Sequence, residues 1–413
     1  MKKIEGFRCV ECAAECGISE TKYVCPRCRG NLQVVYDDKA LRRRVSRKSL
    51  KADPERSLWR YLDLLPLEDR RRGVAAVDVG WTPLYRARRL GAALGLKRLY
   101  LKDDGRNPSA SFKDRASAVV AARAAQTGEK TVAGASTGNA AASLACMMAG
   151  NPSRPVIFVP RSAPTAKLAQ LLIYGAVVFS VDGSYDDAFD LCGKACDEFG
   201  WYNRNTGYNP FTREGKKTCA FELCEQLDWR VPDLVFVPVG DGNIISGLWK
   251  GFSQFHALGL IDKLPRLVAV QAEGSAAVAR AWKEDRPIRP VSGKTLADSI
   301  SVSVPRDGAA AVAAVRQSKG FAVTVSDREI LAAVSAVALG ANVFAEPAAA
   351  AAYAGLAKCA AQGRVRENDS TVIVITGNGL KDVASALKAS GRPHLIGTGM
   401  APLRRLAARE RLI

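Results

Sequence analysis

The chain has few of the residues on which many hydrolases and metalloenzymes depend. Only two of its 413 residues are histidine. His256 lies in a predicted helix beside Phe252 and Phe255, and His394 lies in a loop with proline and glycine. Two isolated histidines cannot build a Ser-His-Asp triad or a histidine metal site, which excludes most hydrolase mechanisms.

Long hydrophobic runs are also missing, since no apolar stretch reaches the ~20 residues of a membrane-spanning helix. The basic start of the chain is followed by no apolar signal region. The eleven cysteines are an odd number. Six of them lie singly in predicted helices, as reduced core thiols do (Cys146, Cys192, Cys196, Cys219, Cys224 and Cys359). We therefore expect a cytoplasmic protein with no membrane partner.

Acidic residues are scarce relative to basic ones, 41 against 60, which gives a formal net charge of +19. Nucleic acid is one partner for such a surface. The arginines, however, fall in dispersed runs at 42–44, 70–72, 86–89 and 404–405, without the interleaved aromatics of a base-stacking groove. Small anions, or an arginine-rich composition alone, explain the excess equally well, so we do not expect a nucleic-acid partner.

Two CxxC pairs stand near the start, Cys9-Val-Glu-Cys12 and Cys25-Pro-Arg-Cys28, twelve residues apart. Two such turns can place four thiolates tetrahedrally around Zn²⁺. A ribbon of residues 1–36 is too small to fold unaided, and metal binding, worth about 10–16 kcal/mol in zinc-finger peptides, would supply the free energy. We predict a closed structural site, with Cys16 outside it.

From residue 80 onward, short β-rich runs alternate with alanine-rich helical stretches. The runs lack polar alternation, as parallel strands covered on both faces do. We expect buried strands at 131–135, 155–159, 176–180, 234–237, 267–270 and 371–375. The predicted fold is α/β with two parallel-sheet domains after the ribbon. The expected divisions are a helical connector at 37–75, a large domain at 76–131 and 213–395, a small inserted domain at 132–212, and a basic tail at 396–413.

Lys113 follows a short strand at 98–101 and a turn, and it stands where a helix should begin. The positive end of a helix and partial burial both favour a neutral amine, the form that attacks a carbonyl. A solvated surface lysine is the alternative. Three predicted strands also end in a loop of small residues before a helix, at 135–139, 239–243 and 376–379.

Ligands of open α/β sheets bind on such loops at the carboxyl ends of the strands. The loop at 239–243 is not GxGxxG, which disfavours a dinucleotide. Together with Lys113, the loops predict a phosphorylated cofactor that carries an aldehyde.

These motifs resemble the fold-type II pyridoxal-phosphate enzymes, and among them the threonine synthases that carry a zinc ribbon. The resemblance rests on residues 107–115, 136–139, 240–243 and 376–382, and on Glu346-Pro347. It implies that Lys113 bonds to the cofactor and then moves protons. It further implies cofactor contacts from Asn139, Thr376 and the phosphate-binding residues Gly240, Asp241, Gly242 and Asn243. The implied cofactors are pyridoxal 5'-phosphate and structural Zn²⁺.

The reaction implied by this resemblance converts O-phospho-L-homoserine to L-threonine, by γ-elimination of phosphate and addition of water at Cβ. A serine or threonine ammonia-lyase, or a β-replacement enzyme, would use the same cofactor motifs and is the alternative. The implied partner is a small anionic amino acid, and the oligomeric state stays open, a homodimer included. Substrate contacts are expected from Ser111, Arg115, Ser136, Thr137, Asn205, Thr206 and Arg213.

The resemblance weakens at residues 203–218. The related motif reads Asn-Ser-x-Asn-Pro-x-Arg ahead of Glu-Gly-x-Lys-Thr. Without gaps, its arginine falls on Thr212, and with small insertions Asn205-Thr206 and Arg213 take the expected roles. Lys216 and Lys217 are expected on a surface turn. Ala110 and Ala116, where the family has glycine, are milder departures.

Overall fold

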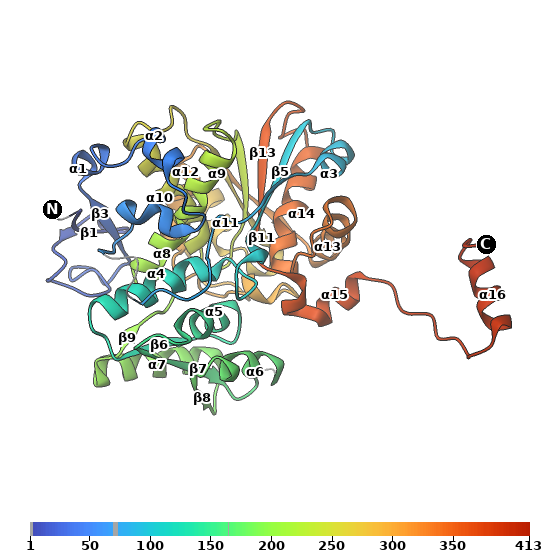
Figure 1. The fold of residues 1–413 in the computed structure, drawn as a ribbon, viewed down its shortest axis with the longest axis horizontal. Helices are drawn as coiled ribbons and strands as arrows, with labels where there is room; N and C mark the ends of the chain where they lie inside the picture. The colour runs from blue at the N-terminus through green and yellow to red at the C-terminus, as the bar shows by residue number, and fades with distance from the viewer. Residues whose placement is uncertain (1–2, 69–72, 164) are drawn as a thin grey trace.

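The computed structural model describes residues 3–68, 73–163 and 165–413. Residues 1–2 of the expected ribbon, 69–72 of the expected connector and 164 lie outside these ranges. The N-terminal segment forms a three-stranded antiparallel sheet in the order β2-β1-β3 (Figure 1). Its strands are β1 (Ile4–Cys9), β2 (Glu15–Cys16) and β3 (Leu32–Tyr36). Helices α1 (Asp38–Arg42), α2 (Arg47–Ala52) and η1 (Leu58–Leu64) follow.

A six-stranded sheet of order β12-β11-β10-β13-β5-β4 forms the larger layer. Its strands are β4 (Leu84–Arg86), β5 (Arg98–Asp103), β10 (Leu234–Pro238), β11 (Arg266–Ala272), β12 (Phe321–Val325) and β13 (Ser370–Ile375). All neighbours are parallel except β4, which pairs antiparallel with β5. The expectation of a parallel α/β fold is confirmed, although β12 was not foreseen.

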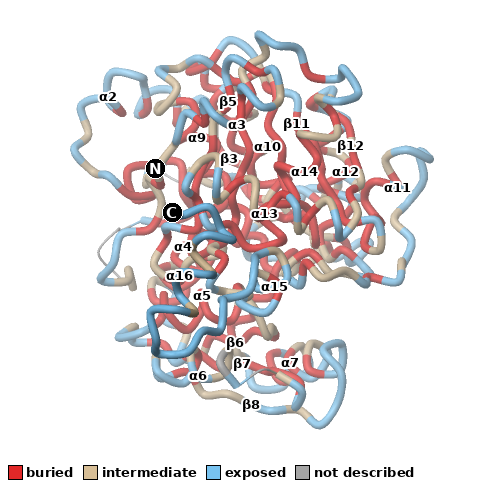
Figure 2. Tube along the Cα trace, turned by 90° about the vertical axis from the view of Figure 1, so that its right-hand side faces the viewer, coloured by how far each residue is buried: buried red, intermediate tan, exposed pale blue. Residues whose placement is uncertain are grey.

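Helices cover both faces of this sheet. Side chains alternate along β10, so that Val235 and Val237 pack in one core cluster with Phe252 of α10 (Asn243–Ala257). Phe236 packs in the opposite cluster with Leu356 of α14 (Pro347–Ala361). These five side chains are fully buried, and Figure 2 shows the buried chain running through the middle of this layer. The remaining helices are α3 (Arg88–Ala93), α8 (Phe211–Lys216), α9 (Thr218–Gln226), α11 (Ala277–Glu284), α12 (Gly308–Gln317) and α13 (Asp327–Ala341).

A separate four-stranded parallel sheet has the order β8-β7-β6-β9. It contains β6 (Thr131–Ala135), β7 (Arg154–Pro160), β8 (Val177–Val181) and β9 (Tyr202–Asn203), with α5 (Asn139–Met148), α6 (Thr165–Ile173) and α7 (Tyr185–Phe199) packed around it. Strand β8 was expected to be buried, which is wrong: its residues are half-buried or exposed because it forms the edge of the sheet.

The last elements are α15 (Val383–Ala389) and α16 (Met400–Arg409). An extended segment separates them, and α16 stands away from the body of the molecule (Figure 1). None of its residues is buried. Within the described ranges, no helix is both long and apolar enough to cross a bilayer.

Candidate active site

Two adjoining cavities lie where the carboxyl ends of the strands of both sheets face each other. They share Asn139, Ser299, Glu346 and Ala348. Lys113, the loop 240–245 and Thr376 line one of them. Thr137, Lys167, Gln170 and Lys381 line the other. The three small-residue loops predicted from the sequence therefore meet around one space.

Lys113 is the first residue of α4 (Lys113–Gln126) and is partly exposed to the cavity. The preceding backbone is tied to the end of β13, because the Phe112 N–H donates to the Thr376 carbonyl at 2.8 Å. Burial lowers the pKa of Lys113, and Arg204 lowers it further against the opposing carboxylates of Asp241 and Glu346. The lowered pKa favours the neutral amine, which is the reactive form, more than in a lysine exposed to water.

The loop from Gly240 to Asn243 forms a cup at the start of α10. Gly242 has φ +91°, and a Cβ there would lie 2.7 Å from the Ala311 Cβ, so only glycine fits. The Asp241 carboxylate accepts from the Arg306 N–H at 3.1 Å, which holds the loop closed. Backbone N–H groups at a helix start suit a phosphate. With the Lys113 amine beside them, these groups fit a phosphorylated aldehyde.

Asn139 begins α5 on the facing side of the cavity. Its amide nitrogen donates to both carboxylate oxygens of Glu346, at 3.1 and 3.0 Å, and to Ser299 Oγ at 3.2 Å. Burial raises the pKa of Glu346. A Cβ at Gly377 would lie 2.4 Å from this carboxyl group, so the glycine of the third loop makes room for Glu346.

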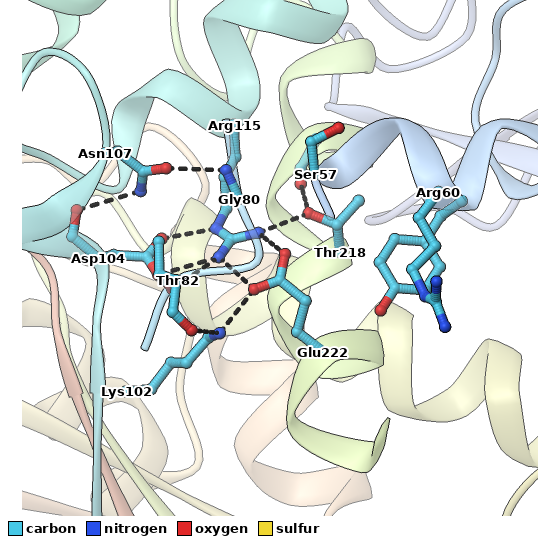
Figure 3. Close-up of polar contacts among 12 residues, drawn as sticks. Ser57, Arg60, Gly80, Thr82, Lys102, Asp104, Asn107, Arg115, Thr218 and Glu222 are labelled. Atoms are coloured by element: carbon cyan, nitrogen blue, oxygen red, sulfur yellow. Dashed lines mark hydrogen bonds and ion pairs between the residues drawn. The ribbon is translucent and has the colours of Figure 1, made fainter. Parts of the chain in front are cut away.

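Arg115, which was expected to contact the substrate, lines neither cavity. It lies two residues after Lys113, about 200° around the helix. Its fully buried guanidinium donates to Asp104 at 2.6 Å and to Glu222, as Figure 3 shows. The same Glu222 carboxylate accepts from Lys102 at 2.6 Å. The arginine of the Lys-Asp-Arg motif therefore anchors α4.

Arg213 and Asn205 also lie outside the cavities. Arg213 forms an ion pair with Asp307 at 2.5 Å and donates to the Leu32 carbonyl of the N-terminal sheet. Asn205 accepts from the Ala135 N–H at 2.8 Å and so supports the end of β6. Thr206 accepts from Arg204 at 2.9 Å, and Ser111 is buried next to Phe112 with its hydroxyl lacking a hydrogen-bond partner. Of the seven expected substrate residues, Thr137 lines a cavity, and Ser136 accepts from the Gly138 N–H beside it.

The surface position expected for Lys216 and Lys217 is wrong, because both side chains are fully buried. Lys217 pairs with Glu214 at 2.6 Å, and Lys216 donates to Asn243 Oδ1 at 2.6 Å. Arg204 was not foreseen at all and is 2% exposed. The only sequence signal for it was a basic residue in an otherwise small and polar segment.

The four thiols of Cys9, Cys12, Cys25 and Cys28 all lie within 4.8 Å of one another. Individual Sγ–Sγ distances are 3.5, 3.7 and 3.4 Å. Four sulfurs at about 2.3 Å from a central Zn²⁺ would stand about 3.8 Å apart, so the cluster fits a tetrahedral metal site. Cys16 is buried outside the cluster.

Comparisons with known proteins agree with this geometry. Residues 76–377 match the family described as pyridoxal-phosphate dependent enzyme. The chain is 39% identical to the threonine synthase of Methanocaldococcus jannaschii, over 97% of this chain and 98% of that protein. It is 38% identical to the threonine synthase of Methanosarcina acetivorans, over 96% and 97%. The chain therefore belongs to the pyridoxal-phosphate-dependent enzyme family and, within it, to the threonine synthases.

Solved structures support the fold alone. The processed form of threonine deaminase isoform 2 from Solanum lycopersicum matches with TM-score 0.64 and 22% identity, over 75% of this chain and 88% of that chain. Maize serine racemase matches with TM-score 0.60 and 22% identity, over 80% and 93%.

Proposed function

We propose that the protein makes L-threonine from O-phospho-L-homoserine, releasing phosphate and adding water at Cβ. The observation that carries this proposal is the 39% identity to the Methanocaldococcus jannaschii threonine synthase across nearly the full length of both chains. The cavity around Lys113 supports it, because the groups that line it match a phosphorylated aldehyde cofactor.

The cofactor, when bound, supplies the electron sink that stabilises negative charge on the substrate. Lys113 would hold the cofactor through its amine and exchange protons with the substrate carbons, a role that its lowered pKa supports. Gly240, Asp241, Gly242 and Asn243 would hold the cofactor phosphate. Asn139 and Thr376 line the same cavity and would contact the cofactor, with Glu346 holding the Asn139 amide in place.

Zn²⁺ bound by Cys9, Cys12, Cys25 and Cys28 completes the proposal as a structural ion. Four sulfur ligands would fill a tetrahedral shell and leave no position for substrate. We also propose a cytoplasmic location, because none of the eleven cysteines, all of them among the described residues, pairs in a disulfide. We further propose that the four-stranded sheet at 131–203 moves as a unit over the substrate, as the small domain expected at 132–212.

The direct experiment supplies the holoenzyme with O-phospho-L-homoserine and measures phosphate and threonine together. Equal amounts of both products are the expected result. Serine and threonine are tested in parallel for conversion to keto acids. Turnover of these two without phosphate release from phosphohomoserine would replace the proposal with an ammonia-lyase.

A further inference from the structure

Seven lysine and arginine residues of the described chain are almost completely buried. A buried charge without a partner is costly, so each needs a compensating anion. Five of the seven have a carboxylate in an ion pair: Arg60, Lys102, Arg115, Arg213 and Lys217. Among the described residues, no carboxylate lies within ion-pair distance of the other two, Arg204 and Lys216. These two are the cations that need an explanation.

Arg204 follows β9 of the four-stranded sheet and reaches toward α4. It donates to Ser117 Oγ at 3.2 Å and to Thr206 Oγ1 at 2.9 Å, and its buried Nε has no hydrogen-bond partner. Ser117 is one helical turn after Lys113, so the guanidinium rests on the face of α4 that carries Lys113. Burial lowers the pKa of Arg204 to about 10, although Tyr185, Asp114 and Asp241 each raise it.

Lys216 does not itself line either cavity, but it contacts a residue that does. Its ammonium contacts Asn243 Oδ1 at 2.6 Å, and Asn243 lines the cavity that contains Lys113. Thr212 Oγ1 also lies 3.4 Å from this oxygen. In the ungapped alignment, the arginine of the related motif falls on Thr212, and in that alignment Lys216 brings a positive charge close to this position.

We propose that Arg204 and Lys216 together bind the phosphate group of the substrate. The proposal rests on the function proposed above and assigns the residues that recognise its leaving group. A phosphate dianion would neutralise both cations and accept from the unpaired Arg204 Nε. The cofactor phosphate has its own cup of backbone N–H groups at the start of α10.

Besides burial, Arg204 lowers the pKa values of both Lys113 and Lys216, as a cation on the Lys113 face of α4 would. Burial lowers the pKa of Lys216, and the positive charges of Lys113 and Arg204 lower it further. The carboxylates of Asp307 and Asp241 raise it in part. Two buried cations without a carboxylate partner form a candidate anion site. Such a site would also release inorganic phosphate slowly, so phosphate should inhibit the enzyme competitively.

The test compares Arg204→Gln and Lys216→Gln with the holoenzyme, and Lys194→Gln on the exposed side of α7 serves as a charge-matched control. Each site variant should raise KM for phosphohomoserine and the inhibition constant of inorganic phosphate about ten- to a hundred-fold. The pyridoxal-phosphate content per chain should not change. Shifts no larger than those of Lys194→Gln would overturn the proposal, as would loss of cofactor at unchanged KM.

Arg204→Lys and Lys216→Arg separate lost charge from a disturbed fold, because they keep the charge and should recover most of the affinity. If one glutamine variant fails to fold, the KM and the inhibition constant of the other variant test the proposal, since each variant removes one of the two cations. If the wild-type holoenzyme releases no phosphate from phosphohomoserine, the proposed function is refuted. Calorimetric titration with inorganic phosphate then tests the cation pair: binding that both variants lose supports it, and no binding by the wild type overturns it.

Discussion

At the scale of single residues, the position and pKa of each basic side chain depend on whether a carboxylate pairs with it. Lys113 has no carboxylate in ion-pair distance among the described residues, and burial and Arg204 both lower its pKa. By contrast, the neighbouring Arg115 has two carboxylates and a purely internal position. The two basic residues of this short motif therefore differ: Lys113 lines the cavity, whereas Arg115 is paired with carboxylates inside the protein.

Lys113→Ala should abolish covalent attachment of the cofactor. Turnover should fall by at least about 10²–10⁴-fold, since the variant has no base to move the substrate protons. Borohydride reduction followed by peptide mass spectrometry measures the attachment, with label on Lys113 in the wild type and none in the variant. A variant that still forms the reducible yellow species would mean that another amine holds the cofactor.

Gly242→Ala should weaken cofactor binding about ten-fold, because φ is +91° and the new Cβ would meet Ala311. Equilibrium dialysis of pyridoxal phosphate measures this. Gly193→Ala is the matched control, since that glycine lies inside α7 with open space around its Cβ position. The control should bind cofactor normally and be slightly more stable. Equal cofactor affinity in both variants would contradict the proposal that the loop 240–243 binds the cofactor phosphate.

At the scale of elements, one buried ionic cluster fixes the helix that carries Lys113. Arg115 of α4, Lys102 of β5 and Glu222 of α9 meet with Asp104, all fully buried (Figure 3). Burial opposes the charge of Glu222, but Arg115 and Lys102 outweigh it and hold its pKa at about 2. The cluster thus joins three elements from distant parts of the chain.

Glu222→Gln should lower the free energy of unfolding by about 3–5 kcal/mol at pH 7, because two buried cations lose their partner. In the wild type, the pKa of Glu222 lies below its unfolded value of 4.5, so its stabilisation is present above pH 4.5 and is lost as the pH falls toward 2. Urea titrations between pH 2 and 7 should show that this slope is reduced in the variant.

The control for this prediction is Glu367→Gln. Glu367 pairs with Lys97 on the surface, where both side chains are more than half exposed, so the change should cost less than about 1 kcal/mol. Similar losses in the two variants would mean that the buried cluster adds no stability of its own.

At the scale of the whole molecule, hydrogen bonds connect the N-terminal segment to the loop 240–243 that lines the cavity. Asn31 donates to Asp307 at 3.1 Å, and Asp307 in turn accepts from Arg213 and from Asn243 of the cup. Tyr36 donates to Glu214 at 2.7 Å, next to Lys217. Loss of the ribbon would therefore remove support from the loop 240–243, which we propose to hold the cofactor phosphate.

Cys25→Ala should lose bound zinc, lower the thermal transition and weaken cofactor binding. Metal analysis of the purified protein and calorimetry measure the first two, and dialysis measures the third. Cys16→Ala is the control, because this buried thiol lies outside the cluster and the variant should keep its zinc. Full metal content in Cys25→Ala would refute the four-thiol site.

The sequence by itself determined the parallel α/β fold, the thiol cluster, the position of Lys113 and the three loops that meet around it. These features follow from local patterns: strand hydrophobicity, CxxC spacing, and small residues between a strand and a helix. The tertiary structure alone decided the roles of the basic residues between 203 and 217. Arg213 pairs with Asp307, and Lys216 contacts Asn243, partners that no local pattern connects. Whether a buried cation is neutralised by the protein or left for a ligand depends on which distant carboxylates the fold brings within reach.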